Sequence, residues 1–162
     1  MDLTGTNRKD LPRREHLQRL PVAHGKPPVF LVTSVVRERR AALGTDAMAE
    51  VVVSALGETS ERYGWLVGRY VIMPDHVHFF CSPAAAFGDL SRFVGGFKER
   101  ATRAAWAQGR KGRLWQAEFF DHLLRSTESY EEKWHYVWLN LVRAGLCTEP
   151  GDWPYQGEIE VL

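Results

Sequence analysis

Two β-rich runs joined by a two-residue turn constrain the fold of this 162-residue chain more than any other feature. The runs are WLVGRYVIM (65–73) and HVHFFCS (76–82), and the Pro-Asp pair between them favours a short turn or bulge. Two strands connected so closely pair as an antiparallel hairpin. The chain therefore contains an antiparallel sheet with this hairpin in it.

The second run carries two histidines on one face. His76 and His78 are two positions apart, and side chains two apart on a strand point to the same side of the sheet. The opposite face takes an apolar set typical of a core, namely Val77, Phe79 and Cys81. Two neighbouring imidazoles are candidate metal ligands, although such a pair on its own is more often simply two polar side chains on a strand that bind no metal.

The remaining patterns indicate an α+β fold. Further strands are expected at 29–36 and 118–125, and helices within 40–64 after the cap candidate Thr45, within 87–108 after Gly88 or Asp89, and from Ser129 to Ala144. This order, with the hairpin in the middle, matches the ferredoxin-like βαββαβ plan of one antiparallel sheet with helices packed on it. A C-terminal helix follows that plan.

The C-terminal helix has two distinct sides. At about 100° per residue, one stripe is apolar and suits packing on the sheet; its members are Tyr130, Trp134, Val137, Trp138 and Leu141. The nearly opposite side carries Tyr136, Asn140 and Arg143. Asn140 lies one turn after Tyr136 and directly beside it.

A metal site is expected if the histidine face of the sheet meets this polar side of the helix. Two imidazoles and an amide oxygen suit a divalent ion such as Mg²⁺ or Mn²⁺, and the absence of thiolates argues against structural zinc. A phenol beside such an ion is a candidate nucleophile toward a phosphate. His122 is a rival ligand, although a hydrogen-bonded structural role suits it better.

The charge distribution points to a nucleic acid. Residues 1–113 carry 18 Lys and Arg against 11 Asp and Glu, whereas residues 114–162 carry 3 against 9. Basic clusters with aromatic residues among them suit single-stranded nucleic acid, although each cluster alone also fits a solvated surface. The candidates for nucleic-acid contact are Lys98, Arg100, Arg103, Arg110, Lys111, Arg113 and Trp115.

Composition also bears on where the protein works. Two cysteines are too few for a disulfide scaffold and favour a reducing compartment. No stretch approaches the ~20 apolar residues of a membrane span, and the N-terminus has no apolar signal core. We therefore expect a cytoplasmic protein, located at the nucleoid when bound to DNA, with no membrane partner.

Two segments resemble one known family. MPDHVHFF resembles the histidine–hydrophobe–histidine (HUH) motif of single-tyrosine transposases, and the C-terminal part, ending in LNLVRAGL and DWPY, is similar to the branch called REP-associated tyrosine transposases. The resemblance covers about residues 28–155. It places a basic arm at 1–28, the catalytic domain at 29–145 and an acidic tail at 146–162.

The resemblance implies a mechanism. His76 and His78 would be metal ligands, Asn140 would take the place of the third ligand, and Tyr136 would attack a DNA phosphate to form a 5′-phosphotyrosine link. The substrate implied is single-stranded or hairpin DNA from palindromic repeats, with the protein acting as a monomer or homodimer. Asp75 stands where Asn is frequent, and Leu141 replaces a common Pro. The alternative is a domesticated, catalytically silent hairpin-binding protein.

Overall fold

The computed structural model describes residues 26–84, 88–125 and 128–162, so nearly all of the arm expected at 1–28 lies outside the described residues. None of the described helices is long and apolar enough to cross a bilayer. In chain order, with η marking a short 3-10 helix, the elements are β1 (Phe30–Val35), η1 (Arg37–Arg39), α1 (Asp46–Tyr63), β2 (Trp65–Met73), β3 (His76–Pro83), α2 (Leu90–Ala107), β4 (Phe120–Leu123), α3 (Tyr130–Arg143), η2 (Pro150–Asp152) and β5 (Gln156–Glu158).

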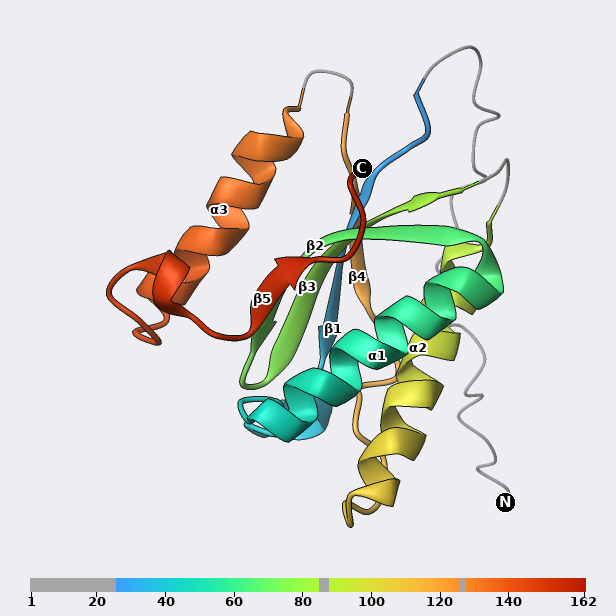
Figure 1. Cartoon of the computed structure of the whole chain (residues 1–162), viewed down its shortest axis with the longest axis vertical. Coiled ribbons are helices and arrows are strands. Elements are labelled where there is room, and N and C mark those ends of the chain that lie inside the picture. Colours follow the sequence, from blue (N-terminus) through green and yellow to red (C-terminus); the bar gives the residue numbers. More distant parts are fainter. Residues whose placement is uncertain (1–25, 85–87, 126–127) are drawn as a thin grey trace, which may run out of the picture.

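One antiparallel sheet in the order β4-β1-β3-β2-β5 forms the centre of the molecule. The first four positions reproduce the ferredoxin-like arrangement, so the fold class expected from the sequence is confirmed. Figure 1 shows α1 and α2 on one side of the sheet and α3 on the other. The two faces of β3 therefore look into different surroundings.

The helices begin where local capping chemistry allows. Thr45 and Ser129, both expected caps, accept hydrogen bonds from the backbone N–H groups of Met48 and Glu132. The Asp89 carboxylate accepts two N–H groups at the start of α2. A side-chain cap of this kind stabilises a helix by about 1 kcal/mol.

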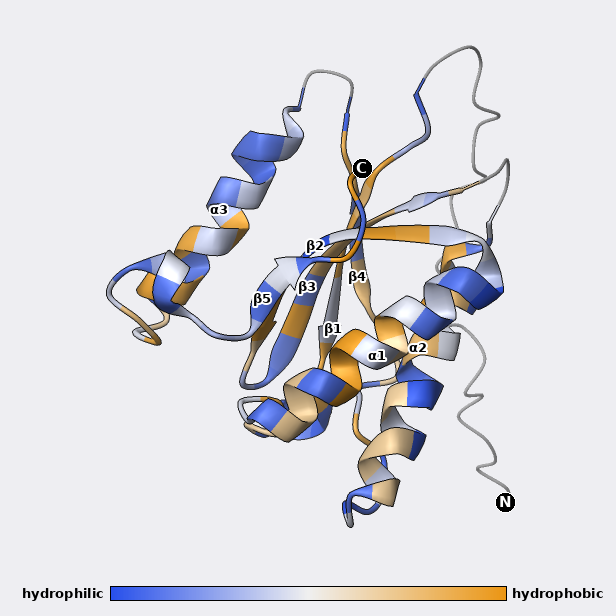
Figure 2. Cartoon of the chain, in the orientation of Figure 1, coloured by the Kyte–Doolittle hydropathy of each residue, from blue (hydrophilic) through white to orange (hydrophobic). Residues whose placement is uncertain are grey.

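Two separate cores hold the layers together. The larger lies between the sheet and the α1–α2 pair and contains Val77, Phe79 and Cys81, as the alternation along β3 predicted. The smaller lies under α3 and contains Phe80, Val137 and Leu141, among others. In Figure 2 the strands carry most of the strongly hydrophobic colour, whereas α3 is hydrophilic over much of its length. Because Phe80 shares a strand face with the two histidines, the histidine face is the one that α3 covers.

The C-terminal segment completes the sheet and holds α3 in place. The indole N–H of Trp153 donates to the Ile72 carbonyl at 2.9 Å, and β5 pairs with β2. The indole N–H of Trp138 on α3 donates to Oε1 of Gln156 in β5 at 2.5 Å. The sequence indicated only an acidic tail here, because a three-residue strand shows no alternation that a pattern could detect.

Candidate active site

The two histidines of β3 turn their ring nitrogens toward one another. The Nε2 atoms of His76 and His78 are 3.0 Å apart, and the rings meet edge to face with centroids 4.6 Å apart. Both rings lie at the end of the hairpin where β3 begins. The spacing of the pair in the sequence therefore predicted their common face correctly.

Each ring is fixed from behind through its other nitrogen. His76 Nδ1 lies 2.6 Å from Oδ1 of Asp75, and His78 Nδ1 lies 2.7 Å from Oγ1 of Thr33 on β1. A carboxylate only accepts hydrogen bonds, so the proton of a neutral His76 belongs on Nδ1 and its Nε2 carries a lone pair. Contacts of this kind orient metal-binding histidines in proteins.

The protonation states of His78 and of Asp75, the residue behind His76, suit a metal site. Burial, together with the neighbouring His76, lowers the pKa of His78 to about 3, so this imidazole is neutral at physiological pH. Burial alone would raise the pKa of Asp75, but the hydrogen bond and charge of His76, with help from Arg39, bring it below its usual value. A neutral imidazole and an ionised carboxylate behind the other are what a divalent ion requires.

The Nε2 separation fits a shared ion. Imidazole nitrogens ~2.0–2.1 Å from one ion, at roughly a right angle to each other, would be about 3.0 Å apart. Within the described part of the chain, no three or more His, Cys, Asp and Glu side chains form a cluster that could hold a metal. Asn140, whose amide oxygen is the third ligand expected from the sequence, is of another residue type.

Helix α3, which carries Tyr136 and Asn140, covers the histidine face of the sheet. Val137 and Leu141 face the sheet, and Trp138 reaches toward β5 at the far edge. Tyr136 precedes Trp138 by two positions, about 200° around the helix, so it and Asn140 lie on the side of α3 directed away from β5. Helix α3 itself packs on β2, the neighbour of β3 in the sheet.

Arg143 links the two polar residues of α3. Its Nη1 donates to Oδ1 of Asn140 at 3.2 Å, and its guanidinium carbon lies 5.0 Å from the centroid of the Tyr136 ring. The Tyr136 side chain is 56% exposed, so its hydroxyl is open to a substrate. A phosphate that entered beside Tyr136 would therefore meet a guanidinium as well as a phenol.

Asp75 allows a prediction about ion binding. Asp75→Ala removes the acceptor behind His76 and is expected to weaken Mn²⁺ binding by about 10- to 100-fold. Asp75→Asn keeps a carbonyl acceptor and is expected to stay within a few-fold of the natural protein. Titration calorimetry with Mn²⁺ measures both variants. Equal affinities for Asp75→Ala and the natural protein would show that this contact does not position His76.

Strand β4 places a residue beside the site that the sequence did not single out. Phe120 pairs with Thr33, and Thr33 pairs with His78, so these three side chains form one row on the α3 side of the sheet. Phe120 is 57% exposed and lies two strand spacings, about 10 Å, from His78. His122 is on the same face and bonds Glu128 through Nε2 at 2.8 Å, in keeping with the hydrogen-bonded role expected for it.

Several predicted DNA contacts are engaged elsewhere. Trp115 is only 5% exposed and packs against Phe97, so its ring is not available to a base. The Lys98 ammonium donates to the backbone carbonyls of Gln116 and Glu118, and burial lowers its pKa to about 8. These placements argue against a direct role for either side chain in binding DNA.

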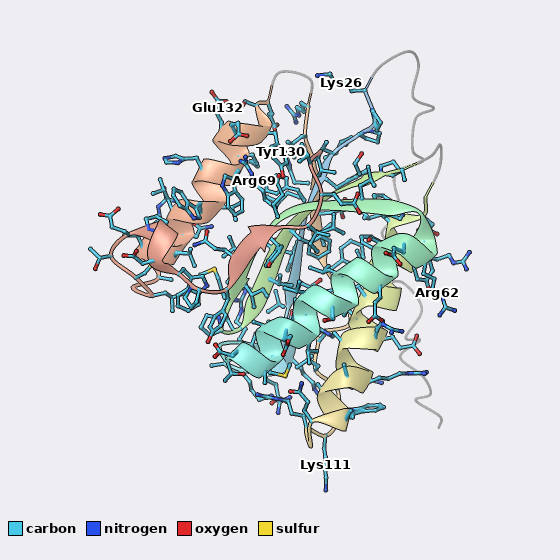
Figure 3. All side chains as sticks on the ribbon, viewed as in Figure 1. Lys26, Arg62, Arg69, Lys111, Tyr130 and Glu132 are labelled. Carbon is cyan, nitrogen blue, oxygen red and sulfur yellow. The ribbon has the colours of Figure 1, made fainter. Side chains whose placement is uncertain are left out.

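The other predicted contacts divide into two groups. Arg100 pairs with Glu58, and Arg103 pairs with Glu99 at 2.5 Å, on the surface of α1 and α2 that faces away from the histidines. Arg110, Lys111 and Arg113 lie in the loop after α2. Figure 3 shows Lys111 projecting from that end of the molecule.

Next to the histidines lies a basic turn, the segment RERR (37–40). Glu38 and Arg39 have positive φ angles of 58° and 50°, an uncommon backbone conformation for these residues. Arg39 Nη1 lies 3.5 Å from Oδ2 of Asp75. Its proximity to the histidines depends on the pairing of β1 with β3, which residue spacing alone does not reveal.

Comparison with known proteins places this arrangement in a family. A family model described as "Transposase IS200 like" matches residues 30–145, most of the chain. The chain belongs to the IS200-like transposase family. A REP-associated tyrosine transposase of Escherichia coli (strain K12) is 25% identical over 130 residues, which cover 80% of this chain and 76% of that protein.

A solved structure shows the same fold. It is described as a REP-associated tyrosine transposase bound to a REP hairpin, with a TM-score of 0.71 and 24% identity over 88% of this chain and 81% of the other. The resemblance drawn from MPDHVHFF and the C-terminal half is therefore confirmed.

Proposed function

We propose that this transposase-family protein cleaves and rejoins single-stranded, hairpin-bearing DNA through a 5′-phosphotyrosine intermediate formed by Tyr136. The observation that carries the proposal is the convergence of two imidazole Nε2 atoms on the sheet face that α3, the helix of Tyr136 and Asn140, covers. The hairpin recorded in the related structure supports DNA of that shape as the substrate.

The proposed ligands of a Mg²⁺ or Mn²⁺ ion are His76 Nε2, His78 Nε2 and the amide oxygen of Asn140. When bound, the ion would polarise a phosphate oxygen and offset the charge that develops on it. Arg143 donates to the Asn140 oxygen in this structure, so it would have to share or release that oxygen when the ion binds. Its guanidinium would then be free to bind the DNA phosphate.

The reaction conserves the phosphodiester. The Tyr136 oxygen forms a bond to phosphorus, and the bond from phosphorus to the 3′ oxygen breaks. The phenol loses its proton, and the departing 3′ oxygen gains one. A later attack by a 3′-hydroxyl reverses these steps and joins strands, so no nucleotide cofactor is needed.

The direct test of this function is a covalent adduct. The full chain is incubated with a hairpin-bearing single strand and Mn²⁺, then separated on a denaturing gel. A protein–DNA band that depends on Mn²⁺ and is removed by chelation supports the proposal. Hairpin binding without nicking at any Mg²⁺ or Mn²⁺ concentration would favour the catalytically silent alternative.

Phe120 allows a prediction about substrate placement. Base stacking on an exposed aromatic ring contributes ~1–3 kcal/mol, so Phe120→Leu is expected to slow adduct formation by about 5- to 140-fold at limiting DNA. Phe120→Tyr keeps a ring and is expected to retain most of the rate. Leu123→Ala is a suitable control, because Leu123 is exposed on the other face of the same strand. Equal rates for Phe120→Leu and the control would contradict stacking at Phe120.

A further inference from the structure

A cleft of about 230 Å³ lies at the end of α2, near the end of the sheet where β3 begins. Its lining includes the cations Arg40, Arg110, Lys111 and Arg113, the ring of Trp106, and no acidic side chain. We call these five residues and the space between them the basic cleft. Within the described residues, none of its four cations has a recorded ion pair.

The loop that forms the basic cleft has a defined shape. Gly109 and Gly112 adopt φ angles of 87° and 77°, a left-handed conformation that strongly favours glycine. The Trp106 Nε1–H donates to the Gly112 carbonyl at 2.8 Å, which fixes the indole while leaving it 51% exposed. The aromatic ring is thus held in place without being buried.

The basic cleft is physically joined to the histidine site. Arg40 donates through Nη2 to the Arg113 carbonyl at 3.3 Å, so the cleft is continuous with the 37–40 turn. In that turn Arg39 contacts Asp75, and Asp75 holds His76. Arg39, Arg40 and Arg113 therefore lie in series between the proposed cleavage site and the loop that holds Trp106.

The larger groove between α1 and α2 offers a contrast. It measures about 710 Å³, but Glu50, Glu58 and Glu99 line it together with its arginines. Arg100 and Arg103 are already paired with two of these acids. A polyanion would find little net positive charge there, whereas the basic cleft is complementary to phosphate.

We propose that the basic cleft binds one unpaired nucleotide of the DNA strand, with the base stacked on Trp106 and the flanking phosphates on Arg110, Lys111 and Arg113. This inference rests on the proposed function. It names the part of the protein that binds the single-stranded DNA at a distance from Tyr136. The cleft is smaller than the ~300–1,000 Å³ of sites for whole small molecules, which suits a single base. Duplex DNA keeps its bases paired and would gain only the phosphate contacts.

The test compares two fluorescent DNA probes by anisotropy, with the full chain and without metal. One probe is oligothymidine, and the other is a blunt-ended, fully paired DNA duplex. Trp106→Leu is expected to weaken oligothymidine binding by about 5- to 140-fold, the usual range for one stacked base, and to leave duplex binding within two-fold. Trp106→Phe is expected to retain most of the affinity.

A charge-matched pair of double variants tests the phosphate contacts. Arg110→Gln with Arg113→Gln is expected to reduce the salt slope of oligothymidine binding by about 1.4, because each single-strand phosphate contributes ~0.7. Arg62→Gln with Arg92→Gln removes the same charge from the α1–α2 surface and is expected to leave the slope unchanged.

Any of three results would overturn the proposal. The first is an unchanged oligothymidine affinity in Trp106→Leu, and the second is an equal loss of affinity for both probes in that variant. The third is an equal salt slope in the two double variants. Because no cleavage is measured, these results are independent of Tyr136. Loss of adduct formation with an intact probe difference would instead refute the proposed function and leave the cleft assignment standing.

Discussion

Replacing Tyr136 with Phe is expected to abolish the covalent protein–DNA adduct while leaving hairpin binding within about two-fold. The change removes one oxygen from a side chain that is 56% exposed, so the packing of α3 through Val137 and Leu141 is unaffected. Loss of the covalent nucleophile lowers the rate by roughly 10⁶-fold in a well-studied protease. A denaturing gel measures the adduct, and anisotropy measures binding.

Tyr63→Phe is the matched control for this experiment. Tyr63 ends α1 on the other side of the sheet, where its ring contacts Arg62 and Arg92. We expect this variant to form the adduct at the natural rate. An adduct that persisted in Tyr136→Phe would remove Tyr136 from the reaction and leave the histidine pair without its proposed nucleophile.

Replacing either histidine is the second large effect. His76→Ala and His78→Ala each remove one of two converging nitrogens and are expected to weaken Mn²⁺ binding by more than the ~10- to 100-fold that a supporting residue costs. Electron paramagnetic resonance of free Mn²⁺ measures the bound fraction, and adduct formation should fall with it. Because His78 is largely buried, His78→Gln serves as a second variant that preserves more of its volume.

His135→Ala controls for the loss of an imidazole. His135 lies on α3 beside Trp138, and its side chain is exposed to solvent. This variant is expected to bind Mn²⁺ and form the adduct like the natural protein. Unchanged Mn²⁺ affinity in both His76→Ala and His78→Ala would show that the ion, if bound, lies elsewhere.

Much of the fold could be predicted because local signals and the global arrangement agree. Alternation in HVHFFCS specified which side chains of β3 enter the larger core, and Thr45 and Ser129 marked the starts of α1 and α3. The two sides of α3 followed from helical spacing. Strand β5 could not be foreseen, since three residues containing a glycine carry no periodic signal and depend on pairing with β2.

The surface chemistry was harder to predict than the strands. The sequence does not distinguish a basic residue in an ion pair from one without. Arg100 pairs with Glu58, whereas Arg113 has no recorded ion pair among the described residues. An aromatic residue in a basic segment is likewise ambiguous: Trp115 entered the core, and Trp106 stayed exposed. Thr33 and Phe120 gained their positions only through pairing between strands distant in the sequence.

The most direct test of the central claim is to identify the amino acid that carries the DNA. After adduct formation with Mn²⁺, nuclease digestion leaves a short nucleotide remnant, and trypsin releases residues 134–143, whose single tyrosine is Tyr136. Mass spectrometry is expected to find the remnant on that peptide. A remnant on any other peptide, such as 126–133 with Tyr130, would contradict the assignment of Tyr136 as the nucleophile.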